Sequence, residues 1–253
     1  MSDVLPLKNG IIYGPVNSRR LGRSLGINLL PPGRKWCTFD CLYCQYGWTP
    51  APEEADPSAG VPSPEDVESA VAAALAGADR PPAYLTFSGN GEPTLHPRFP
   101  EIVEIVRRLR GRLAPRAKVA LLSNAAGIDR PLIRAAVGRI EYPILKLDAG
   151  NAAVFAFYNR PDPGIAYDAV VKGLRETPGI ILQALFTAGP KGNLQAAHVG
   201  DWIERIGEIR PIEVQIYTLA RPVPSPDISP APGAALLDIR DRLRRAGLAA
   251  RVF

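Results

Sequence analysis

The chain has 253 residues, of which 46% are hydrophobic and 22% are charged, and its formal net charge is +5. This is enough for one domain with a full hydrophobic core. No apolar run approaches the roughly eighteen residues that cross a bilayer, and the N-terminal residues lack the pattern of a signal peptide, so we expect neither a membrane-spanning nor an exported protein. We therefore expect a cytoplasmic protein, in a compartment that keeps thiols reduced.

Short apolar runs alternate with amphipathic segments along the chain, a pattern typical of βα units around a mostly parallel sheet. Strands are expected at 24–30, 83–88, 118–123, 143–148, 179–186 and 213–219, and helices at 64–76, 97–110, 129–137, 167–175, 199–209 and 234–246. Right-handed crossovers would wrap these pairs into a partial (β/α)6 barrel, similar to a TIM barrel but open at the side. We expect one domain over 1–253, with an N-terminal extension at 1–23 and a proline-rich insert at 49–64.

The only three cysteines lie within eight residues, as Cys37, Cys41 and Cys44 in a C-x3-C-x2-C run. Three thiolates can hold three irons of a [4Fe–4S] cluster and leave the fourth iron open. Zinc is an alternative, although it usually takes four ligands, and both histidines, His96 and His198, lie far away in sequence. An odd count disfavours disulfides, and the polar residues between the cysteines disfavour simple apolar packing.

Several unusual segments fall where the expected strands end, which is the rim that carries the chemistry in βα barrels. They are Cys37–Cys44, Gly89–Glu92, Asn124, Lys146 with Asp148, and Tyr217 with Thr218 and Arg221. The sequence therefore predicts that cysteines, a glycine-rich turn and polar side chains meet on one rim.

Three stretches of sequence resemble the radical S-adenosylmethionine (SAM) superfamily. They are Tyr13–Asn28, the cysteine loop with Tyr43 before its last cysteine, and Ser88–Pro97. Within the superfamily they are most similar to an iron–sulfur oxidoreductase branch that is loosely related to the wyosine-base-forming tRNA enzymes.

The resemblance implies a role for each matching residue. Cys37, Cys41 and Cys44 would ligate a [4Fe–4S] cluster, and Tyr43 would lie near the adenine of SAM. Gly89, Asn90, Gly91 and Glu92 match a turn that holds the amino group of SAM, with Asn90 where a glycine is usual. Ser123 and Asn124 would meet its ribose or carboxylate, and Lys146, Asp148 and Gln183 would line the site.

The implied activity is reductive cleavage of SAM to a 5′-deoxyadenosyl radical, by an oxidoreductase or transferase that takes hydrogen from its substrate. RNA or tRNA modification is the preferred substrate hypothesis, which the positive charge permits. Two alternatives remain: an activase that acts on a glycine of a partner protein, and a non-catalytic iron–sulfur or electron-transfer protein. A flavodoxin or ferredoxin would supply the electron. Arg19, Arg20 and Arg23 would form its docking surface or be ordinary surface arginines.

Overall fold

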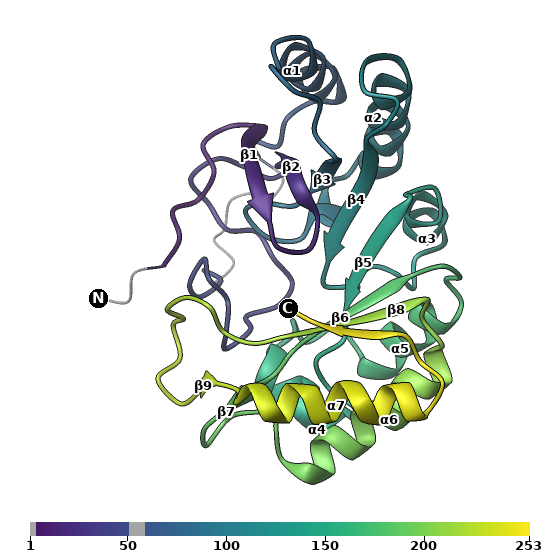
Figure 1. Ribbon diagram of the computed structural model, residues 1–253. Helices are drawn as coiled ribbons and strands as arrows, with labels where there is room; N and C mark the ends of the chain where they lie inside the picture. The colour runs from purple at the N-terminus through teal and green to yellow at the C-terminus, as the bar shows by residue number, and fades with distance from the viewer. Residues whose placement is uncertain (1–3, 51–58) are drawn as a thin grey trace.

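The computed structural model describes residues 4–50 and 59–253, and an eight-stranded sheet forms its centre (Figure 1). All six predicted strands are present as parallel neighbours: β2 (Gly22–Ile27), β3 (Tyr84–Phe87), β4 (Lys118–Ser123), β5 (Tyr142–Lys146), β6 (Ile181–Leu185) and β8 (Glu213–Tyr217). Two further strands extend the sheet: β1 (Ile12–Ser18) pairs antiparallel with β2, and β10 (Ala250–Val252) pairs parallel with β8. The sheet is open, with β1 and β10 at its two ends, as expected for a partial barrel.

The six predicted helices follow their strands and lie along the outside of the curved sheet (Figure 1). They are α1 (Pro64–Ala76), α2 (Phe99–Leu113), α3 (Pro131–Val137), α5 (Tyr167–Arg175), α6 (Ala196–Ile209) and α7 (Gly233–Arg245). Ser63 caps α1, because its hydroxyl accepts from Asp66 N while the Asp66 carboxylate accepts from Ser63 N. Residues 51–58 of the predicted proline-rich insert lie outside the described residues.

Three short elements and a strand pair were also not predicted. They are η1 (Pro93–Leu95), α4 (Ala152–Val154), the π-helical turn η2 (Phe155–Asn159), and β7 (Thr187–Ala188) paired with β9 (Ser229–Pro230). Among the described helices, none is both long and apolar enough to cross a membrane.

Apolar side chains bury both faces of the sheet. Alternate residues of a strand point to opposite faces, so Val119 and Leu121 of β4 belong to the main core with the helices, whereas Ala120 does not. Ala120 instead packs with Ile144, Ile181 and Leu21 in a second cluster on the concave face. Leu21 lies in the turn between β1 and β2, so this hairpin is anchored to the inside of the partial barrel.

Candidate functional site

The cysteine loop runs between β2 and α1, and neighbouring segments hold it in place. Cys44 N donates to Cys41 O (3.1 Å), which closes a turn between the last two cysteines. Leu42 N donates to Tyr158 O (3.1 Å), so the loop is also attached to η2. Cys41 is buried, Cys37 and Cys44 are partly buried, and none of the three forms a disulfide.

Two of the thiols accept hydrogen bonds from asparagine side chains. Asn124 Nδ2 lies 3.6 Å from Cys37 Sγ, and Asn159 Nδ2 lies 3.6 Å from Cys41 Sγ. Burial raises the pKa of Cys37 well above its usual value and that of Cys41 to about 11. Among the described residues, no three His, Cys, Asp or Glu side chains are arranged to hold a single metal ion. A cluster makes a different demand, because each of its three thiolates binds a different iron.

The glycine-rich turn after β3 packs directly against the start of the cysteine loop. Gly91 forms an isolated parallel bridge with Trp36, and Glu92 N donates to Trp36 O (3.0 Å). Gly89 and Gly91 have φ angles of 146° and 145°, which favour glycine. A Cβ at Gly91 would overlap Trp36 O, and one at Gly89 would overlap the Asn28 side chain. Glycine is therefore required at both positions.

Asn90, between these glycines, is fully buried and bonds within the protein. Its Nδ2 donates to Lys8 O (2.8 Å) and Pro31 O (3.0 Å), and its Oδ1 accepts from Lys8 N (2.7 Å). Both amide N–H groups are therefore used, and the side chain ties the segment before β1 to the turn.

Glu92 joins the turn to the end of β4. Its Oε1 accepts from Thr94 N (3.0 Å), Thr94 Oγ1 (2.6 Å) and Ser123 Oγ (2.8 Å), and its Oε2 accepts from Asn124 N (2.6 Å). Burial raises the pKa of this carboxyl group, while the same hydrogen bonds oppose the rise. The structure thus brings Glu92, Ser123, Asn124 and Cys37 together, as the sequence predicts.

A second group of predicted residues surrounds Cys41. The Tyr43 hydroxyl donates to Asp148 Oδ2, which also accepts from Asn159 Nδ2 (2.8 Å). Burial and the nearby Asp148 raise the pKa of Tyr43 well above its usual value. Asn159 was not predicted. It ends a π-helical turn and is 118 residues from Cys41 in sequence, so no local pattern identifies it.

Lys146, Gln183 and Tyr217 lie next to this group. Lys146 Nζ is 2.8 Å from the Tyr217 hydroxyl, 3.5 Å from Asp148 Oδ1 and 4.5 Å from the Tyr43 ring centre. Burial lowers the pKa of Lys146, but Asp148 and Tyr217 raise it more, so the ammonium group stays charged. Gln183 Oε1 accepts from the Tyr217 hydroxyl (3.4 Å).

The three arginines near the N-terminus do not act as one surface. Arg20 stacks on the Tyr217 ring (4.6 Å), and Arg23 lines a separate cavity of about 230 Å³ beside the end of α1. Of the three, only Arg19 is exposed.

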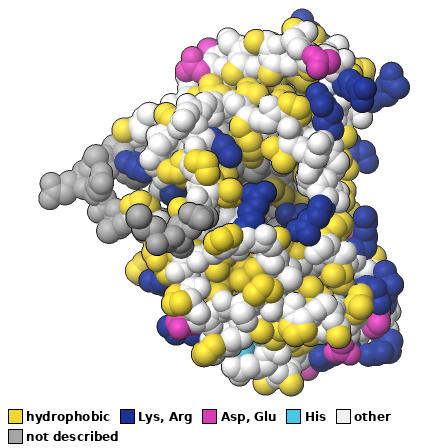
Figure 2. Space-filling model, turned by 60° about the vertical axis from the view of Figure 1, so that its left-hand side comes forward, with side chains coloured by type: hydrophobic (Ala, Val, Ile, Leu, Met, Phe, Trp, Pro, Cys, Tyr) yellow, Lys and Arg dark blue, Asp and Glu magenta, His cyan; other side chains and the backbone are white. Residues whose placement is uncertain are grey.

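A hollow in the molecular surface has Lys and Arg side chains near its centre (Figure 2).

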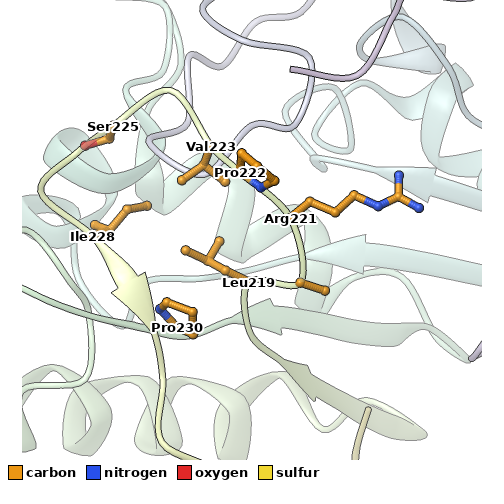
Figure 3. A pocket seen from close by; sticks show the side chains of 8 residues that line it. Leu219, Arg221, Pro222, Val223, Ser225, Ile228 and Pro230 are labelled. Atoms are coloured by element: carbon orange, nitrogen blue, oxygen red, sulfur yellow. The ribbon is translucent and has the colours of Figure 1, made fainter. Parts of the chain in front are cut away.

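The loop after β8 borders an open pocket of about 550 Å³ (Figure 3). Its lining is mostly apolar, with Leu219, Val223 and Ile228 among the residues, and the Arg221 side chain extends away from them. Burial raises the pKa of Tyr46 to about 12, and the positive charge of Arg221 opposes that rise. This loop therefore lies close to the residues that follow Cys44.

A family model described as the radical SAM superfamily matches residues 34–177, which contain the cysteine loop and the glycine-rich turn. A UPF0026 protein of Synechocystis sp. is 30% identical over 222 residues, which are 84% of this chain and 77% of that protein. A protein named GTPase Obg from Brachyspira hyodysenteriae is 28% identical over 85% of this chain. The aligned part covers 31% of that protein and 48% of a UPF0026 protein from Methanocaldococcus jannaschii, so the match spans about half or less of these two relatives.

Three solved structures show the same fold. A radical SAM methyltransferase from Sphaerobacter thermophilus has a TM-score of 0.66 at 14% identity, over 91% of this chain and 65% of that one. TYW1 with a bound lysine–pyruvate adduct has a TM-score of 0.59 at 16% identity, over 88% and 73%. A structure of anSMEcpe with bound AdoMet has a TM-score of 0.60 at 18% identity, over 90% and 63%. Since the family model covers more than half of the chain and contains its cysteine loop, the protein belongs to the radical SAM superfamily.

Proposed function

We propose that the protein is an enzyme that holds a [4Fe–4S] cluster on Cys37, Cys41 and Cys44 and uses it to cleave SAM reductively. The observation that carries this proposal is that all three thiols lie on one loop, which is bonded to the Gly89–Glu92 turn.

The surroundings of the thiols fit such a cluster. Asparagine N–H groups point at Cys37 and Cys41, and hydrogen bonds to cluster sulfurs tune the reduction potential. The Glu92 carboxylate and the polar side chains of Ser123 and Asn124 suit an amino acid ligand such as the methionine part of SAM. When bound, the cluster supplies the electron that breaks the C5′–S bond of SAM to give a 5′-deoxyadenosyl radical.

The chain's own residues would bind and orient SAM. Gly89 and Gly91 have no side chain, so a ligand can approach the backbone closely. Among the described residues, Glu92 Oε2 accepts only from Asn124 N. A carboxylate oxygen has two lone-pair sites, so Oε2 can also accept from the ammonium group of SAM. We assign Tyr43 to the adenine, and Ser123 with Asn124 to the ribose or carboxylate.

Lys146, Asp148 and Gln183 would line the same site. Asp148 orients Tyr43 through its hydroxyl, and Lys146 places a positive charge over the Tyr43 ring. Asn90 would hold the turn in place rather than contact SAM with its side chain, because that side chain donates hydrogen bonds to Lys8 O and Pro31 O.

For the substrate we propose RNA, with tRNA as the first candidate, and a flavodoxin or ferredoxin as the electron donor. The support is the net charge of +5 and the likeness in fold to TYW1. The test uses bulk tRNA from cells grown in heavy water, incubated with the reconstituted protein, dithionite and SAM. Hydrogen transfer from tRNA would put deuterium into 5′-deoxyadenosine, and mass spectrometry would detect it.

Two controls separate the alternatives. Nuclease-digested tRNA measures the contribution of contaminating protein. A different result would support the activase alternative. In that case deuterium would come only from a deuterated protein fraction, a stable protein radical would appear in the electron paramagnetic resonance spectrum, and the substrate would be a partner protein rather than RNA.

A further inference from the structure

We propose that Arg20, Lys146 and Gln183, together with Tyr217, bind a carboxylate or phosphate group of the substrate on the concave face of the sheet. The proposal rests on the proposed function, since it identifies a chemical group of the substrate that the enzyme would act on.

Arg20 is directed inward by the hairpin that carries it. Its neighbour Leu21 is buried with Ala120, Ile144 and Ile181 on the concave face, and the Arg20 guanidinium stacks on the Tyr217 ring at 4.6 Å. Arg20 Nη1 is buried and has no hydrogen-bond partner among the described residues. A buried donor without an acceptor is costly, so this one can take an acceptor from a ligand.

Gln183 presents a second unsatisfied donor in the same place. Gln183 is only 5% exposed. Its Oε1 accepts from the Tyr217 hydroxyl (3.4 Å), and its Nε2 has no partner among the described residues. Gln183 is directly opposite Lys146 in the ladder between β5 and β6, and Lys146 Nζ contacts the same hydroxyl (2.8 Å). Arg20, Lys146 and Gln183 therefore all lie around Tyr217.

The charges at this place do not balance. Arg20 and Lys146 contribute two positive charges, and the Asp148 carboxylate lies 3.5 Å from Lys146 Nζ. Asp148 also accepts from Tyr43 and Asn159 on one oxygen and from Leu185 N on the other. One further negative charge would pair with Arg20 and accept from Gln183 Nε2. Hydrogen bonds between charged groups are stronger than neutral ones.

The test measures anion binding without turnover. The cluster-loaded full chain is titrated with inorganic phosphate or acetate, with and without saturating SAM, at constant ionic strength set with chloride, and thermal unfolding is followed. We expect saturable stabilisation by at least one anion, with SAM present. Stabilisation by phosphate would identify a phosphate group, and stabilisation by acetate a carboxylate.

Substitutions assign the effect to Arg20. Arg20→Gln should weaken anion binding at least about tenfold, because it removes a charge-assisted hydrogen bond. Arg20→Lys should keep part of the affinity, which separates charge loss from misfolding. Arg19→Gln is the matched control, since it makes the same charge change on the exposed neighbouring residue and should bind as wild type does.

Three results would overturn the proposal. The first is that no anion stabilises the wild type saturably. The second is that anions stabilise Arg20→Gln as much as the wild type. The third is that stabilisation by anions is lost when SAM is bound, which would show that SAM itself binds these donors. The measurement does not depend on SAM cleavage, so a protein that makes no 5′-deoxyadenosine can still bind the anion. Failure of this inference and failure of the proposed enzyme activity are therefore distinguishable.

Discussion

Asn90 replaces the glycine that is usual in the turn, and its side chain makes three hydrogen bonds to the backbone of Lys8 and Pro31. Asn90→Ala would leave these backbone groups unsatisfied, so we expect the free energy of unfolding to fall by about 2–4 kcal/mol. Urea unfolding measures it, with Asn9→Ala as an exposed control. Equal stability of both variants would show that these bonds do not anchor the N-terminal segment.

Cys41 is a residue whose behaviour should depend on pH. Burial raises the pKa of its thiol from 9.0 to about 11. The folded state without cluster therefore gains stability from the neutral thiol below about pH 9, and loses it as the pH rises through about 11. Mass spectrometry of iodoacetamide alkylation should give a midpoint for Cys41 near pH 11 in the folded chain and near 9 in urea. Identical midpoints in both states would contradict the burial argument.

At the residue scale, the sequence predicts which side chains lie together only where a local motif is present. The sequence predicts that the cysteine loop, Glu92, Ser123 and Asn124 come together, because strand ends of a parallel sheet share one edge. It gives no sign of Asn159, whose contact with Cys41 spans 118 residues. Nor does it reveal that Asn90 bonds backward to Lys8, because that contact depends on how the N-terminal segment folds over the turn.

At the scale of elements, the glycine-rich turn and the cysteine loop form one unit through the bridge between Gly91 and Trp36. Gly91→Ala would force a Cβ into Trp36 O and a residue with a side chain into a φ of 145°. We expect a loss of at least about 2 kcal/mol in stability, together with impaired cluster loading. Iron and sulfide content and urea unfolding would report the two effects.

Gly111→Ala is the control for this change, because the site of its Cβ is open and Gly111 lies inside α2. Alanine favours helix more than glycine does, so Gly111→Ala should be neutral or stabilising by up to about 1 kcal/mol. If Gly91→Ala were as harmless, the close approach of the two loops would not matter for the site.

The elements that the sequence predicts are those with a clear period. The six predicted strands and the six predicted helices are buried on at least one side, and their apolar residues repeat accordingly. β1 was missed because it is mostly exposed, contains Gly14 and Pro15, and has an irregular register with β2. β10 has only three residues, which is too short for any alternation to be visible.

At the scale of the whole molecule, the curved sheet brings residues from both ends of the chain to one region. Arg20 of the first hairpin meets Tyr217 of β8 across the concave face, and the loop of residues 219–230 lies near Tyr46. The segment expected to be an N-terminal extension is thus part of the sheet and of its inner packing. A sequence pattern predicts the partial barrel, but which side chains fill it depends on the curvature of the open sheet.

The central claim is that this chain cleaves SAM with a cluster held by its three cysteines. The most direct test is anaerobic reconstitution with iron and sulfide, addition of dithionite and SAM, and chromatographic measurement of 5′-deoxyadenosine, with Cys41→Ala beside the wild type. We predict 5′-deoxyadenosine from the wild type and none above background from Cys41→Ala. A wild-type protein that contains an intact cluster but neither binds SAM nor forms 5′-deoxyadenosine would contradict the account and leave a non-catalytic iron–sulfur protein.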